Sequence, residues 1–171
     1  MLQTWWRGEW GNLCVSVFVS FYFLYYLSTF RDWHFLDGVN LVIHEAGHII
    51  FLPLGEFMHI AGGSLLQILV PIIFTLYFVV QRRYFSASLL LFWMGQNLLN
   101  VSVYASDAIA MQLPLLGGDN VQHDWNTILT MLHILRYTPH IGYALYVAGA
   151  MSIIAAVALS VIFSQTVGEM T

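Results

Sequence analysis

The chain has few charged residues. Only 8% of its 171 residues are Asp, Glu, Lys or Arg, whereas 59% are hydrophobic. Soluble domains carry about a quarter charged residues, so the composition predicts an integral membrane protein in contact with membrane lipids. With five Lys plus Arg and a formal net charge of -4, the chain also lacks the basic face that phosphate binding requires. We therefore expect no nucleic-acid partner.

Cysteine is nearly absent. The single cysteine, Cys14, cannot form an internal disulfide, and a zinc site built from Cys-x-x-Cys pairs is excluded for the same reason. A metal site in this chain must therefore use histidine and carboxylate side chains. Seven histidines are available for it.

Long apolar segments dominate what is present. They predict an all-α fold, a polytopic transmembrane helical bundle of about five to six membrane helices, because about twenty apolar residues cross a bilayer as a helix. The length suits one transmembrane domain over residues 1–171. The helices are expected near residues 13–30, 39–54, 64–80, 85–112 and 141–163. Two further segments, 56–63 and 125–137, are ambiguous between turns, interfacial helices and short spans.

The second of these helices, at about 39–54, contains the sequence H-E-x-x-H. Side chains four residues apart share a helix face, so His44 and His48 can bind one metal ion. Glu45 beside them is placed to take a proton from a metal-bound water. Ionisable groups at membrane depth are costly and usually serve a function. The pattern predicts a metal site, and the alternative is a pair of buried histidines bonded to neighbouring helices.

A stripe of polar residues marks the predicted helix at about 85–112. Asn97, Asn100, Tyr104 and Asp107 are spaced by three, four and three residues, which places them roughly on one face. A carboxylate in such a stripe belongs in the bundle interior, so Asp107 is the first candidate for a third metal ligand. The two asparagines are explained equally well as hydrogen bonds between helices.

The loop at 113–124 supplies rival ligands. It contains Asp119, His123 and Asp124 in one short segment with glycines. Three protein ligands with a fourth position left to water is the catalytic arrangement of zinc, and His123 or Asp119 are alternatives to Asp107 as the third. Asp124 is equally placed to cap the helix that follows, and Asp119 to form an Asx turn.

His44, Glu45, Gly47 and His48, followed by Gly62-Gly63, resemble the site-2 protease family of intramembrane zinc metalloproteases. The later part of the pattern is either Asn97 or Asn100 before Asp107, or Pro114 before Gly117-Gly118-Asp119. That resemblance implies a core of membrane helices that cleaves substrate transmembrane helices. It implies further that the two histidines and an aspartate hold zinc and that the glutamate acts as the base. The chain also resembles small bacterial membrane proteins with a DWHFLDG…HEAGH…GGD…HDW pattern, which implies the bacterial inner membrane.

Three functions are consistent with these residues. The leading hypothesis is a zinc metalloprotease that hydrolyses peptide bonds within or near the bilayer, with Glu45 as general base and a transmembrane peptide or protein as substrate. The second is a haem-binding membrane protein, because histidines on different helices can ligate a haem. The third is an accessory or structural subunit of a larger membrane complex that carries a metal site. The haem-binding alternative leaves Glu45 without an evident task.

Overall fold

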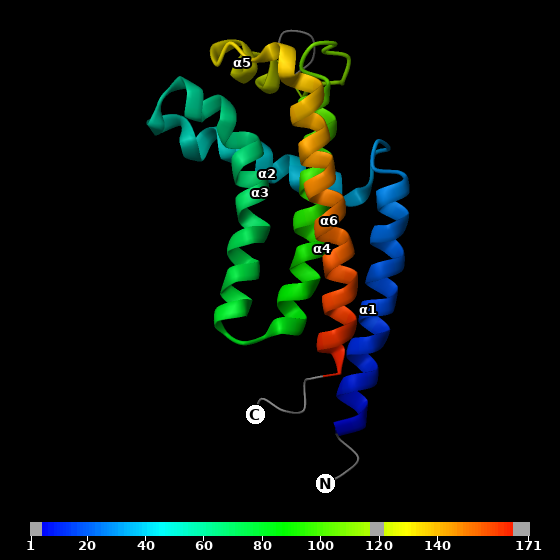
Figure 1. The fold of residues 1–171 in the computed structure, drawn as a ribbon. Coiled ribbons are helices and arrows are strands. Elements are labelled where there is room, and N and C mark those ends of the chain that lie inside the picture. The colour runs from blue at the N-terminus through cyan, green and yellow to red at the C-terminus, as the bar shows by residue number, and fades with distance from the viewer. Residues whose placement is uncertain (1–4, 117–121, 166–171) are drawn as a thin grey trace.

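The structure, a computed structural model, describes residues 5–116 and 122–165 (Figure 1). Every regular element in these ranges is helical, which confirms the all-α prediction. The elements in chain order are α1 (Trp5–Ser28), α2 (Phe35–Phe51), the short 3₁₀ helix η1 (Leu52–Leu54), α3 (Glu56–Val80), α4 (Tyr84–Ser106), α5 (Asp124–Met131), the short 3₁₀ helix η3 (Leu135–Tyr137) and α6 (Thr138–Ser164).

Four stretches of helix are long and apolar enough to cross a membrane, which identifies the chain as a membrane protein. They are Trp10–Ser28, Phe35–Leu54, Glu56–Val80 and Leu135–Ser164. α4 is comparable in length, with 23 residues, but it buries the amide side chains of Gln96 and Asn97 in the bundle. Polar side chains at such a depth belong against protein rather than lipid, and α4 is indeed packed between α3 and α6.

α1, α4, α6 and most of α3 run side by side (Figure 1). Among these helices α4 and α6 share the most extensive contact, and Gly95 and Gly149 face each other there. A Cβ added at either glycine would lie 2.8 Å from the carbonyl oxygen of the other. Small residues of this kind let membrane helices pack backbone against backbone. The buried core that α1, α4 and α6 share consists of Phe23, Tyr26, Phe92, Leu99, Ile153 and Ala156.

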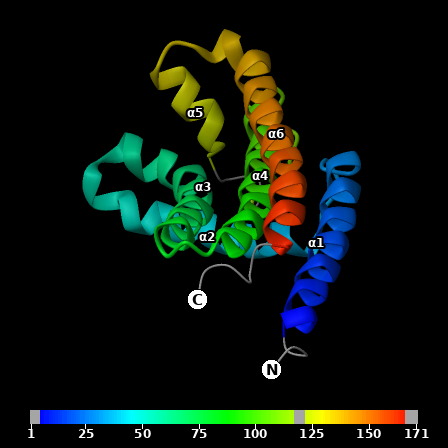
Figure 2. The same cartoon turned by 60° about the horizontal axis from the view of Figure 1, so that its bottom comes forward.

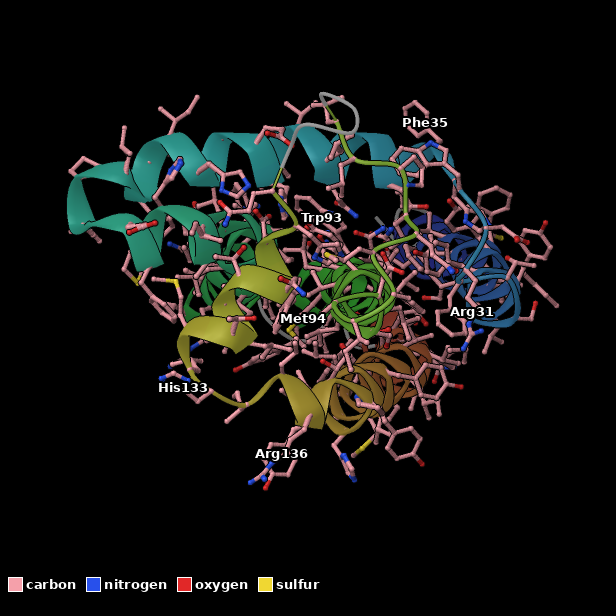
Figure 3. The ribbon with its side chains drawn as sticks, turned by 90° about the horizontal axis from the view of Figure 1, so that it is seen from above. Arg31, Phe35, Trp93, Met94, His133 and Arg136 are labelled. Carbon is pink, nitrogen blue, oxygen red and sulfur yellow. The ribbon has the colours of Figure 1, made fainter. Side chains whose placement is uncertain are left out.

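α2 forms where a helix was expected, but it runs across the bundle. In the view from above, α4 and α6 are seen end-on while α2 lies lengthwise (Figure 3). Its first turn lies near the end of α1, and its far end continues into η1 and the start of α3 (Figures 1 and 2). The helix with the H-E-x-x-H sequence is therefore long and apolar enough to span, yet its axis does not follow that of the other long helices.

Most helices begin or end a few residues from the expected positions, and two of these differences bear on the site. The ambiguous segment 56–63 is the first part of α3 and continues into 64–80 without a break. α4 ends at Ser106 rather than near residue 112. The reason is Asp107, whose carboxylate accepts the backbone N–H groups of Gln112 and Leu113 at 3.0 and 2.9 Å and so turns the chain out of the helix.

Candidate metal centre

Facing glycines bring α2 and α3 into backbone contact beside the H-E-x-x-H sequence. A Cβ on Gly62 would lie 2.6 Å from the carbonyl oxygen of Gly47, and one on Gly63 would lie 2.5 Å from Nε2 of His44. Real Cβ atoms do not approach other atoms this closely. The α3 backbone therefore passes directly over the His44 ring, and both glycines are needed for that approach.

Each of the two histidines is held at Nδ1 by an acceptor from α3. Nδ1 of His44 lies 3.2 Å from Oε1 of Gln67, and Nδ1 of His48 lies 2.8 Å from the carbonyl oxygen of His59. An amide or carbonyl oxygen only accepts, so both rings donate from Nδ1. This is the arrangement usual for metal-binding histidines, because it leaves Nε2 for the metal.

The two Nε2 atoms converge on one carboxylate oxygen. Oδ2 of Asp124 lies 2.9 Å from Nε2 of His44 and 3.3 Å from Nε2 of His48. The ligand atoms of these three residues all lie within 4.8 Å of one another. In a tetrahedral zinc site, bonds of 2.0–2.1 Å place neighbouring ligand atoms about 3.3–3.4 Å apart. The donor set and its spacing therefore fit a zinc ion.

Asp124 reaches the histidines because α5 is tied to the bundle at its first turn. The Asp124 backbone N–H donates to the Tyr104 hydroxyl at 3.1 Å, and Nε1 of Trp125 donates to Oγ of Ser64 at 3.0 Å. Burial by itself raises the pKa of the Asp124 carboxyl, but hydrogen bonds from the two histidines outweigh burial and lower that pKa to about 2. The carboxylate is thus ionised at neutral pH, as a metal ligand must be.

The three residues line a cavity of about 650 Å³. Glu45 also lines it, half-buried, and no side chain or backbone group in the described ranges hydrogen-bonds to its carboxylate. The cavity extends from Tyr104 on α4 to Arg31 and Asp32 after α1, and to residues 113–116 beyond α4. A free carboxylate, a metal-type donor set and space for a ligand therefore share one cavity.

The structure does not bring Asp107 to the histidines. Its carboxylate accepts hydrogen bonds from the backbone that follows α4. It also faces His123, whose Nε2 lies 3.4 Å from Oδ2. His123 is the N-cap of α5, with Nδ1 accepting the N–H of Asn126 at 3.2 Å. Neither Asp107 nor His123 lines the cavity of the metal centre. Asp119 lies outside the described residues.

The third ligand on offer is therefore Asp124, which sequence reasoning treated as a helix cap. Within the described ranges, the only group of His, Cys, Asp and Glu side chains that could hold a metal is His44, His48 and Asp124. The sequence did contain a signal for this ligand, because Asp124 is the last residue of the loop at 113–124, which also contains the alternative ligands Asp119 and His123. The cap at this helix is the neighbouring His123 instead, and that frees the Asp124 carboxylate for the histidines.

No protein-family model, curated protein or solved structure matches the chain. The resemblance to site-2 proteases stays a prediction that rests on the sequence motif.

Proposed function

We propose that this membrane protein is a zinc metalloprotease that hydrolyses peptide bonds within or near the bilayer. One observation carries the proposal: Nε2 of His44 and Nε2 of His48 converge on Oδ2 of Asp124, while Glu45 lines the same cavity. Two histidines and a carboxylate leave a fourth position open for water, as in catalytic zinc sites. Placing zinc there is part of the proposal.

The chemistry divides between the metal and Glu45. Zinc in this site supplies a Lewis acid that polarises the scissile carbonyl and lowers the pKa of water. Glu45 takes a proton from the attacking water as the water oxygen bonds to the carbonyl carbon. When the C–N bond breaks, Glu45 returns that proton to the leaving nitrogen. Its carboxylate is free for this exchange because it forms no hydrogen bond with the described part of the chain.

The surroundings of the site support a membrane-derived substrate. Apolar Leu41 and Ile60 line the cavity from α2 and α3, and Val103 and Leu113 line it from α4 and the segment that follows. α2 crosses the bundle near the end of α1 (Figure 1), so the site lies towards one end of the bundle. We infer that an unwound end of a transmembrane substrate enters there. The resemblance noted above makes the bacterial inner membrane the proposed location.

The test compares cells that express the wild type with cells that express Glu45→Gln. New protein N-termini in their membranes are identified by mass spectrometry, and zinc is measured in both purified proteins. We expect equal zinc in the two proteins, and new termini near membrane spans with the wild type alone. Identical sets of termini from the two strains would overturn the protease. A wild type that lacks zinc and shows a Soret band would replace it with the haem-binding alternative.

A further inference from the structure

A buried carboxylate on α2 lines the same cavity as the metal centre but has no role in the proposed reaction. Asp37, only 2% exposed, sits in the first turn of α2. Its Oδ2 accepts the His34 backbone N–H at 2.7 Å. Its Oδ1 accepts the Tyr26 hydroxyl at 3.0 Å, Nε2 of Gln96 at 2.6 Å and Nδ2 of Asn100 at 3.1 Å. These donors and the positive end of α2 offset the cost of burying the charge.

Two amide side chains connect this carboxylate to the metal centre. Nδ2 of Asn100 donates to Asp37, and Oδ1 of Asn100 accepts Nε2 of Gln67 at 2.8 Å. Oε1 of Gln67 in turn lies 3.2 Å from Nδ1 of His44. Three hydrogen bonds in series therefore run from Asp37 on α2 through α4 and α3 and back to the first histidine of the H-E-x-x-H sequence.

The series has a fixed direction. Both oxygens of the Asp37 carboxylate accept N–H groups, so Asn100 must present its nitrogen to Asp37 and its oxygen to Gln67. Gln67 must then present its nitrogen to Asn100 and its oxygen to His44. An amide oxygen cannot donate, so the proton of the His44 ring belongs on Nδ1. Nε2, which faces Asp124, is then the ring nitrogen at which a bound zinc would replace a proton.

A second branch of the network has the same direction. It begins at the indole of Trp93, which can only donate, and Nε1 of Trp93 lies 2.9 Å from Oδ1 of Asn40. Nδ2 of Asn40 donates to Oε1 of Gln96 at 2.5 Å, and Nε2 of Gln96 donates to Asp37. Both branches therefore end on the same acceptor. Trp93 is the donor at the start of the second branch. His44 holds the equivalent place in the first branch, and it also donates.

We propose that Asp37 is a positioning residue for metal binding, which acts through Asn100 and Gln67 to place the His44 proton on Nδ1. This inference rests on the proposed metal site at His44. An asparagine at position 37 can donate as well as accept, so the direction of the series is no longer fixed. In the reversed series Gln67 points its nitrogen at His44, Nδ1 accepts, and the proton moves to Nε2, where it competes with the metal. Loss of such outer partners costs about 10- to 100-fold in metal affinity.

The test is a double-mutant cycle on the zinc dissociation constant of the full chain in detergent, measured by competition with a chromogenic chelator. Its variants are Asp37→Asn, Gln67→Glu and the two combined. A glutamate at position 67 only accepts, and it fixes the His44 proton without help from Asp37. In the background with the native Gln67, we expect Asp37→Asn to weaken zinc binding about tenfold. In the Gln67→Glu background, we expect the same substitution to have little effect. Equal weakening in both backgrounds would show a general packing defect and overturn the proposal.

A matched control is Asn97→Ser, because Asn97 is a buried amide on the same helix whose one hydrogen bond within the described ranges is to the Trp93 backbone carbonyl. It should leave the dissociation constant unchanged. If Asp37→Asn fails to fold, Asn100→Leu interrupts the same series and enters the same cycle. A wild type without zinc would end the proposed function. If the wild type holds zinc that is lost on mutation of His44, but Asp37→Asn binds zinc as tightly as the wild type, the metal site stands and only the positioning role of Asp37 is wrong.

Discussion

His48 and His59 hydrogen-bond to each other's backbone. Nδ1 of each ring lies 2.8 Å from the carbonyl oxygen of the other residue. Because a carbonyl only accepts, both rings donate from Nδ1. The pair ties the last turn of α2 to the first turn of α3 and leaves Nε2 of His48 facing Asp124. The second histidine of the motif thus depends on a backbone acceptor, whereas the first depends on side chains.

This asymmetry predicts the effect of His59→Ala. The substitution removes the bond to the His48 carbonyl but keeps the His59 carbonyl that holds the His48 ring. We expect a loss of about 1 kcal/mol of stability, with zinc content unchanged. Thermal unfolding in detergent and elemental mass spectrometry measure the two quantities. The control is His140→Ala, an exposed histidine, which should change neither. Zinc lost from His59→Ala would contradict the backbone role.

Gly63→Ala should disturb the metal centre without any change to a ligand. The added Cβ would lie 2.5 Å from Nε2 of His44, so either the ring or the α3 backbone must move. We expect zinc affinity to fall at least tenfold, in line with losses seen when ligand orientation is disturbed. Gly38 lies on the same helix as His44, and in the described part of the chain no heavy atom lies within 4 Å of a Cβ added there. Gly38→Ala should therefore bind zinc like the wild type. Equal affinities in both variants would contradict the close approach of α3.

Gly95→Val should loosen the bundle. Its side chain would meet the Gly149 carbonyl oxygen and the Ile153 side chain on α6, and overpacking of this kind costs about 1–3 kcal/mol. The measurement is thermal unfolding in detergent. Gly11→Val serves as the comparison, because a Cβ there meets no heavy atom of the described residues within 4 Å. A Gly95→Val protein as stable as Gly11→Val would contradict the backbone packing of α4 on α6.

Zinc should stabilise the protein in proportion to its binding. A ligand at a free concentration 100 times its dissociation constant adds about 2.7 kcal/mol to the stability of the folded state. The melting temperature of the wild type should therefore rise when zinc is added and fall with EDTA. Asp124→Ala should show neither change. A rise of equal size in Asp124→Ala would mean that the stabilising zinc binds elsewhere.

The half of the candidate site that is local in sequence could be predicted. His44 and His48 are four residues apart, and helix geometry alone places them on one face. The Gly62-Gly63 pair could be recognised as well, although its physical task, the passage of α3 over His44, became visible only in the fold. The helical segments followed from their apolar length, because a membrane helix satisfies its backbone within itself.

The remainder depends on contacts between distant segments. Asp124 is 80 residues from His44 and meets it because α5 is held against Tyr104 and Ser64. Asp107 satisfied the spacing rule for an interior stripe, but it is the residue at which α4 ends, and its carboxylate caps the turn that follows. The crosswise course of α2 is likewise set by what packs against it, and its composition alone predicts only an apolar helix.

Zinc content by elemental mass spectrometry, in wild type, Asp124→Ala and Asp107→Ala purified without chelator, tests whether the metal centre is formed by His44, His48 and Asp124. Asp124 lies beside both histidines, whereas Asp107 binds the backbone after α4. We predict one zinc per chain in the wild type and in Asp107→Ala, and none in Asp124→Ala. Zinc kept by Asp124→Ala and lost from Asp107→Ala, or no zinc in the wild type, would contradict a metal centre at His44, His48 and Asp124.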